Sequence, residues 1–64
     1  MSNITLKAAR VNAGFTQADV STKLGVAIST VRNWEKGITF PKQPAIEKMC
    51  ELYGISYDCI KFDV

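Results

Sequence analysis

Residues 17–36 constrain the fold of this chain more than any other segment, because apolar residues recur at helical spacing on both sides of a glycine. These apolar residues are Val20, Leu24, Val26, Val31 and Trp34. Residues three or four positions apart share one face of an α-helix. Gly25 separates the two stretches, and a short turn between helices needs a backbone position with positive φ. The segment therefore predicts two short amphipathic helices that meet at Gly25.

The start of the first of these helices is marked by Thr16, a favourable N-cap residue. Asp19 follows three positions later and completes a variant capping box, with Asp in place of Glu or Gln. Phe15 and Val20 are placed for a hydrophobic staple, and Ser21 is small enough to let the second helix approach closely. Two helices joined in this way form a helix-turn-helix, whose second helix enters the major groove of DNA.

The rest of the chain predicts three more helices, marked by residues that start or end helices. Gly14 and Gly54 follow helical stretches, Pro44 suits the first turn of a helix, and Ser56 is a possible N-cap. The five expected helices span residues 3 or 5 to 13, 17–23, 28–35, 44–53 and 57–61. No strand is expected, and a chain of 64 residues is expected to form one domain, residues 1–64.

The net charge of the chain is only +2, but the charges are unevenly distributed. Residues 1–42 carry six Lys and Arg residues against two Asp and Glu residues, a net charge of +4. Residues 43–64 carry two basic residues against four acidic ones, a net charge of −2. The basic part contains the second helix of the predicted motif, which suits a polyanionic partner there. The alternative is an ordinary solvated charged surface.

The composition argues against several other classes of protein. The chain has no histidine and two cysteines cannot fill a four-ligand zinc site, so no metal or other cofactor is expected. We expect Cys50 and Cys59 to be buried free thiols, with a structural disulfide as the alternative. The sequence has no nucleophile elbow, phosphate loop or pair of catalytic carboxylates, so we expect neither an enzyme nor a small-molecule substrate. Without a signal peptide or long apolar run, we expect a soluble cytoplasmic protein without membrane contact.

The run from Gly14 to Gly37 resembles helix-turn-helix domains of the lambda-repressor/Cro (XRE) type, which occur in phage and bacterial regulators. The matching residues are Arg10, Thr16, Gln17, Leu24, Gly25, Val26, Ser29, Thr30, Val31, Trp34, Glu35 and Gly37. The resemblance continues through residues 52–55 and covers about residues 6–62. It implies an all-α fold, a compact five-helix lambda-repressor-like DNA-binding domain with its helix-turn-helix at about residues 17–36.

The function implied by this resemblance is sequence-specific binding of double-stranded DNA by a transcriptional regulator, in particular a phage or prophage repressor of the Cro/CI type. The resemblance also implies a homodimer that acts in the bacterial cytoplasm, at the nucleoid. The homodimer would read a near-palindromic operator, with its two reading helices about one DNA turn apart. The alternative is a non-enzymatic protein-interaction module, antitoxin-like or bridging, with the same fold. Failure to bind any duplex at low salt would favour that alternative.

By correspondence with this family, base contacts fall on Ile28, Ser29 and Asn33, and Asn33 can bond adenine bidentately. Ile28 departs from the polar or basic residue of many relatives, and it either contacts a thymine methyl, packs within the protein or is simply exposed. Ala27 stands where relatives place a Ser or Thr cap, worth ~1 kcal/mol, so the start of this helix is uncertain by one or two residues. Phosphate contacts fall on Gln17, Thr30, Arg32, Lys36, Thr39 and Lys42. The resemblance also implies that Gln17 braces a side chain of the reading helix. The alternative for these polar side chains is a solvated surface without a ligand.

Other residues have structural roles in the resembled family. Arg10 and Glu35 are expected to form a partly buried ion pair that orients the reading helix rather than contacts DNA. Trp34 shares a helical face with Val31, so we expect it in the core, with stacking on nucleic acid as the alternative. Cro-type domains often dimerise through their last helices, which would place an interface at Tyr57, Ile60 and Phe62.

Overall fold

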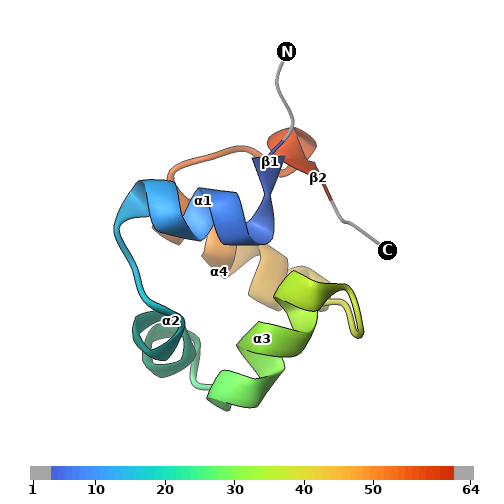
Figure 1. The fold of residues 1–64 in the computed structure, drawn as a ribbon. Helices are drawn as coiled ribbons and strands as arrows, with labels where there is room; N and C mark the ends of the chain where they lie inside the picture. Colours follow the sequence, from blue (N-terminus) through green and yellow to red (C-terminus); the bar gives the residue numbers. More distant parts are fainter. Residues whose placement is uncertain (1–3, 62–64) are drawn as a thin grey trace.

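The computed structural model describes residues 4–61, which form four α-helices, one 3-10 helix and two short strands (Figure 1). In chain order the elements are β1 (Ile4–Thr5), α1 (Leu6–Ala13), α2 (Gln17–Leu24), α3 (Ile28–Lys36), α4 (Gln43–Tyr53), η1 (Tyr57–Cys59) and β2 (Ile60–Lys61). The first four predicted helices are confirmed, with small shifts at their ends. Helix α4 begins one residue before Pro44, which therefore occupies the second position of its first turn.

Helices α2 and α3 form the predicted helix-turn-helix, and Gly25 makes the turn between them with a φ of 70°. The N–H of Val26 closes this turn on the carbonyl of Ser21 at 3.0 Å. The Thr16 hydroxyl accepts from the N–H of Asp19 at 3.0 Å, and the Asp19 carboxylate accepts from the N–H of Thr16 at 2.9 Å. The predicted capping box is therefore confirmed, and its hydrogen bonds lower the pKa of Asp19.

Helix α3 begins at Ile28, although its N-cap residue Ala27 provides no side-chain hydrogen bond. Its register is set by packing, because Val31 is only 1% exposed and lies in the core. The Ala27 carbonyl accepts from the N–H groups of Thr30 and Val31 at 3.0 and 3.4 Å, which starts the helical ladder. The start of α3 is thereby defined, and with it the set of side chains that point away from the core.

The hydrophobic core is shared by all four α-helices and by the second strand. Its buried members are Leu6, Ala9, Val20, Val31, Ile46, Met49, Tyr53 and Ile60. Trp34 is half-buried and packs against this cluster, in agreement with the prediction that it belongs to the core. Cys50 and Cys59 are free and half-buried, and burial raises the pKa of the Cys50 thiol.

The prediction of a fifth helix and of a chain without strands is wrong. Residues Tyr57–Cys59 form only a single 3-10 turn, and Ile60 then adopts extended dihedral angles of −85° and 129°. The strands β1 and β2 pair in parallel, with Ile4 opposite Ile60 and Thr5 opposite Lys61 (Figure 1). A β-branched residue suits this extended backbone, and the strand pairing leaves Ile60 only 8% exposed. The fold is therefore a helical helix-turn-helix domain with a small parallel sheet.

The placement of Ile60 corrects the expected dimer interface. Its side chain belongs to the core, so it is not available as a surface contact between two copies of the chain. Tyr57 is 53% exposed and remains a candidate for the dimer interface, whereas Phe62 lies outside the described residues. Within residues 4–61, no helix is long and apolar enough to cross a membrane, and no group of three or more potential metal ligands comes together.

Candidate nucleic-acid interface

A buried ion pair joins α1 to the last turn of α3. The Arg10 Nε donates to Glu35 Oε2 at 2.7 Å, and Arg10 Nη2 donates to Glu35 Oε1 at 3.3 Å. The two side chains are 10% and 5% exposed. Arg10 Nη1 also donates to the carbonyl of Phe15 at 2.9 Å, which fixes the loop before α2. The hydrogen bond with Glu35 outweighs burial and raises the pKa of Arg10, so this pair holds three segments together as an ion pair.

Gln17 extends this network from the ion pair to the surface. Its amide nitrogen Nε2 donates to Glu35 Oε1 at 3.0 Å. Its carbonyl oxygen Oε1 accepts from Arg32 Nε at 3.3 Å. Gln17 is the first residue of α2, whereas Arg32 and Glu35 both lie on α3. Side chains from α1, α2 and α3 are thus connected in the order Arg10, Glu35, Gln17 and Arg32, a set that we call the relay.

Tyr53 supports the relay from the core side of the molecule. Burial raises the pKa of its hydroxyl to about 12, with a further contribution from the negative charge of Glu35. Its ring lies 6.5 Å from that of Phe15, measured between centroids. An aromatic residue of α4 therefore packs against Phe15, in the loop that the Arg10 guanidinium holds.

The residues expected to contact DNA lie at the start of α2, along α3 and in the segment that follows α3. Ser29, Arg32 and Lys36 are exposed on α3, and Thr39 and Lys42 are exposed in the following segment. The remaining four, which are half-buried, are Gln17, Ile28, Thr30 and Asn33. The half-buried state of Ile28 means that one part of its side chain packs within the protein while the rest reaches the surface.

The electrostatic character of this surface follows from the distribution of its acidic residues. Glu35 is the only Asp or Glu between residues 20 and 46, and it is paired with Arg10. The same segment contains Lys23, Arg32, Lys36 and Lys42, all of which are exposed. Lys23 lies near the carboxylate of Asp19, whereas Arg32, Lys36 and Lys42 lie on α3 or in the segment that follows it. Exposed positive charge on one surface creates a positive potential that attracts a polyanion.

Two features of this region were not anticipated from the sequence. The first is the identity of the reading-helix side chain that Gln17 contacts, because the resemblance implied such a contact without indicating that Arg32 makes it. The second is the exposure of Ile38 and Phe40, at 65% and 50%, in the segment between α3 and α4. The only sequence signal for the latter is two large apolar residues in a loop that has no helical periodicity.

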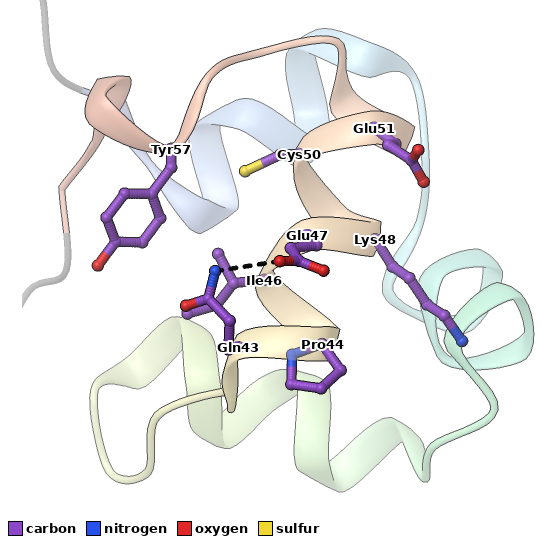
Figure 2. A pocket seen from close by; sticks show the side chains of 8 residues that line it. All are labelled: Gln43, Pro44, Ile46, Glu47, Lys48, Cys50, Glu51 and Tyr57. Atoms are coloured by element: carbon purple, nitrogen blue, oxygen red, sulfur yellow. Dashed lines mark hydrogen bonds between the residues drawn. The ribbon is translucent and has the colours of Figure 1, made fainter.

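A separate groove of about 610 Å³ runs along α4 (Figure 2). Figure 2 shows side chains of α4 lining it, with Tyr57 of η1 beside them. Gln43 Nε2 donates to Glu47 Oε2 at 3.4 Å within this lining. None of the residues that line the groove belongs to α2 or α3, so the groove and the outward face of α3 are distinct surfaces.

Comparisons with known proteins agree with the arrangement of the helices. A family model described as helix-turn-helix matches residues 6–58, from the start of α1 into η1. The HTH-type transcriptional regulator ImmR of Bacillus subtilis (strain 168) is 34% identical to this chain over 53 residues. That alignment covers 83% of this chain and 42% of ImmR, so the chain spans less than half the length of this relative. No solved structure matches the chain significantly.

Substitution of Arg10 by Met should reduce the free energy of unfolding by about 3 to 5 kcal/mol, because it leaves the buried Glu35 carboxylate without its charged partner. Urea denaturation followed by circular dichroism measures the loss. The matched control is Arg32→Met, an exposed residue of the same relay, whose effect should stay within about 0.5 kcal/mol. The double change Arg10→Met with Glu35→Leu should be more stable than Arg10→Met alone, since no unpaired buried charge remains. Equal losses for Arg10→Met and Arg32→Met would contradict this assignment.

Proposed function

Because this chain belongs to the helix-turn-helix family, we propose that it binds double-stranded DNA sequence-specifically as part of a transcriptional regulator. The observation that carries the proposal is the outward face of α3, where polar and cationic side chains are held in place by a buried ion pair. ImmR, which shares 34% identity, is itself described as a transcriptional regulator. A positive surface on a rigid helix of this motif suits the major groove of DNA.

In this proposal α3 reads base edges through three side chains in its first and second turns. Asn33 bonds adenine at N6 and N7, and Ser29 donates to or accepts from a base. Ile28 places its accessible part against a thymine methyl group. Within residues 4–61 the Ser29 hydroxyl and the Asn33 side-chain amide make no hydrogen bond to the protein, so their bonding capacity is available to a ligand.

Contacts with the DNA backbone position the domain on both sides of the reading helix. We assign these contacts to Gln17 at the start of α2, to Arg32 and Lys36 on α3, to Thr30 near its start, and to Thr39 and Lys42 in the following segment. Cationic contacts with phosphate displace condensed counterions, which makes the affinity fall steeply with salt. They fix the register of α3 without reading the base sequence.

The proposed assembly is a homodimer that binds a near-palindromic operator, as a phage-type repressor of the Cro/CI kind does. Two-fold symmetry would place two copies of α3 about one DNA turn apart. With Ile60 in the core, the surface that suits a second copy is the groove on α4 with the exposed Tyr57. Because this groove shares no residue with α2 or α3, two copies can meet there while both reading helices stay accessible.

Selection of bound duplexes from a random DNA pool, repeated at two salt concentrations, tests the proposed function. The expected result is an enriched motif with two related half-sites about one DNA turn apart, retained less well at the higher salt concentration. No enriched motif and no retention at low salt would refute DNA reading. The chain would then belong with the protein-interaction modules, with the groove on α4 as its first candidate surface.

Substitution of Asn33 by Ala should weaken binding to the selected duplex by about 1 to 3 kcal/mol, because a bidentate contact with adenine is lost. The preference at one base pair should be relaxed at the same time. Fluorescence anisotropy with the selected duplex and with duplexes changed at single positions measures both effects. Equal weakening on every duplex would remove Asn33 from the base-reading set.

Substitution of Tyr57 by Ala should weaken binding to a duplex with two half-sites by roughly ten-fold, as expected for a buried aromatic residue at an interface. Binding to a duplex with a single half-site should be unchanged, because one copy needs no interface. The matched control is Val11→Ala, an apolar residue of α1 that is 57% exposed and lies outside the groove. Unchanged cooperativity in Tyr57→Ala, measured by quantitative gel shift, would exclude the groove as the dimer interface.

A further inference from the structure

The groove proposed to hold a second copy is lined by charged side chains of α4. These are Glu47, Lys48 and Glu51, and all of them are exposed. Lys48 and Glu51 also line a smaller groove of about 360 Å³ between α2 and α4, so they lie where the two grooves adjoin. Figure 2 shows both on the side of α4 that faces away from Tyr57. A second copy seated in the larger groove would therefore meet these charges.

The charges of Lys48 and Glu51 are not paired within the chain. Among residues 4–61 their side chains make no hydrogen bond and no ion pair. The lysine precedes the glutamate on the helix, which is the less favourable order for pairing along one helix. Glu47 differs, because its carboxylate accepts a hydrogen bond from Gln43 Nε2 at 3.4 Å. Lys48 and Glu51 are thus available to a partner.

The net charge of the groove limits how two copies can meet there. Two glutamates and one lysine give each groove a net charge of −1, so two copies repel each other unless opposite charges come together. In a two-fold interface every contact between two different residues occurs twice. An axis perpendicular to α4 makes the two helices antiparallel. When this axis passes midway between positions 48 and 51, it places Lys48 of each copy opposite Glu51 of the other.

We propose that reciprocal ion pairs between Lys48 of one copy and Glu51 of the other select a second copy of this chain as the partner of the α4 groove. This inference rests on the homodimer of the proposed function, and it adds the residues that decide which chains can pair. The aliphatic stem of Lys48 covers apolar surface while its ammonium group reaches the carboxylate of the second copy. A chain with a like charge at either position is excluded from the dimer by repulsion.

Charge reversal tests this pairing in the absence of DNA. Lys48→Glu and Glu51→Lys each place like charges opposite each other, so each variant alone should dimerise roughly ten-fold more weakly than the unchanged chain. In an equimolar mixture of the two variants, the heterodimer regains opposite charges at both pairs and should form with the affinity of the unchanged chain. Sedimentation equilibrium measures the dissociation constants, and native mass spectrometry with one isotopically labelled variant identifies the heterodimer.

The matched control is Lys7→Glu, which reverses an exposed lysine of α1 that lines neither groove. It changes the net charge by the same amount as Lys48→Glu, yet the dimerisation of this variant alone should equal that of the unchanged chain. Mixed with Glu51→Lys, it should form less heterodimer than Lys48→Glu does, because in one of the two pairs a lysine would still face a lysine. Thermal unfolding of each variant confirms that it is folded at the temperature of the assay.

Three results would overturn the proposal. The first is an unchanged chain that stays monomeric up to millimolar concentration, and the second is equal dimerisation of the unchanged chain and Lys48→Glu. The third is a mixture of Lys48→Glu and Glu51→Lys that dimerises no better than either variant alone. Because dimerisation is measured without DNA, failure to enrich a DNA motif refutes the proposed DNA reading and leaves the ion pairs standing. A failure of the charge reversals leaves binding to a single half-site untouched.

Discussion

The buried ion pair between Arg10 and Glu35 is the interaction on which the geometry of this domain depends. Two charges withdrawn from water stabilise a fold little beyond what an apolar pair would, but they impose one arrangement because either charge alone is costly. Here that arrangement ties α1 to the end of α3, and a third bond from Arg10 holds the loop before α2. The orientation of α3 relative to α1 and to the loop before α2 is thus determined by buried side chains.

Polar bonding continues outward from this pair to the surface proposed to meet DNA. Gln17 donates to Glu35 and accepts from Arg32, so hydrogen bonds connect the buried ion pair to an exposed cation. Glu35, the acidic residue of α3, is paired with Arg10, which leaves the exposed charge of α3 positive. Structural and binding roles in this small domain are therefore carried by connected residues.

Most of the helical fold could be predicted from the sequence because its signals are local. The capping box at Thr16 and Asp19, the glycine turn at Gly25 and the apolar spacing around Val31 each involve residues within one or two helical turns. The pairing of β1 with β2 could not be predicted in this way, since it joins residues from opposite ends of the chain. The resemblance implied that Gln17 braces a side chain of the reading helix but not that this side chain is Arg32, because the choice of partner depends on how closely α2 approaches α3.

The most direct test of this account is amide chemical-shift mapping of the isotopically labelled protein with a duplex that carries one selected half-site. The largest shifts should fall on α3, on the start of α2 at Gln17 and on residues 37–42. Amides along the groove on α4 should change little, because a single half-site recruits no second copy. Shifts concentrated on α4 and η1, with the amides of α3 unperturbed, would contradict the claim that α3 is the helix that contacts DNA.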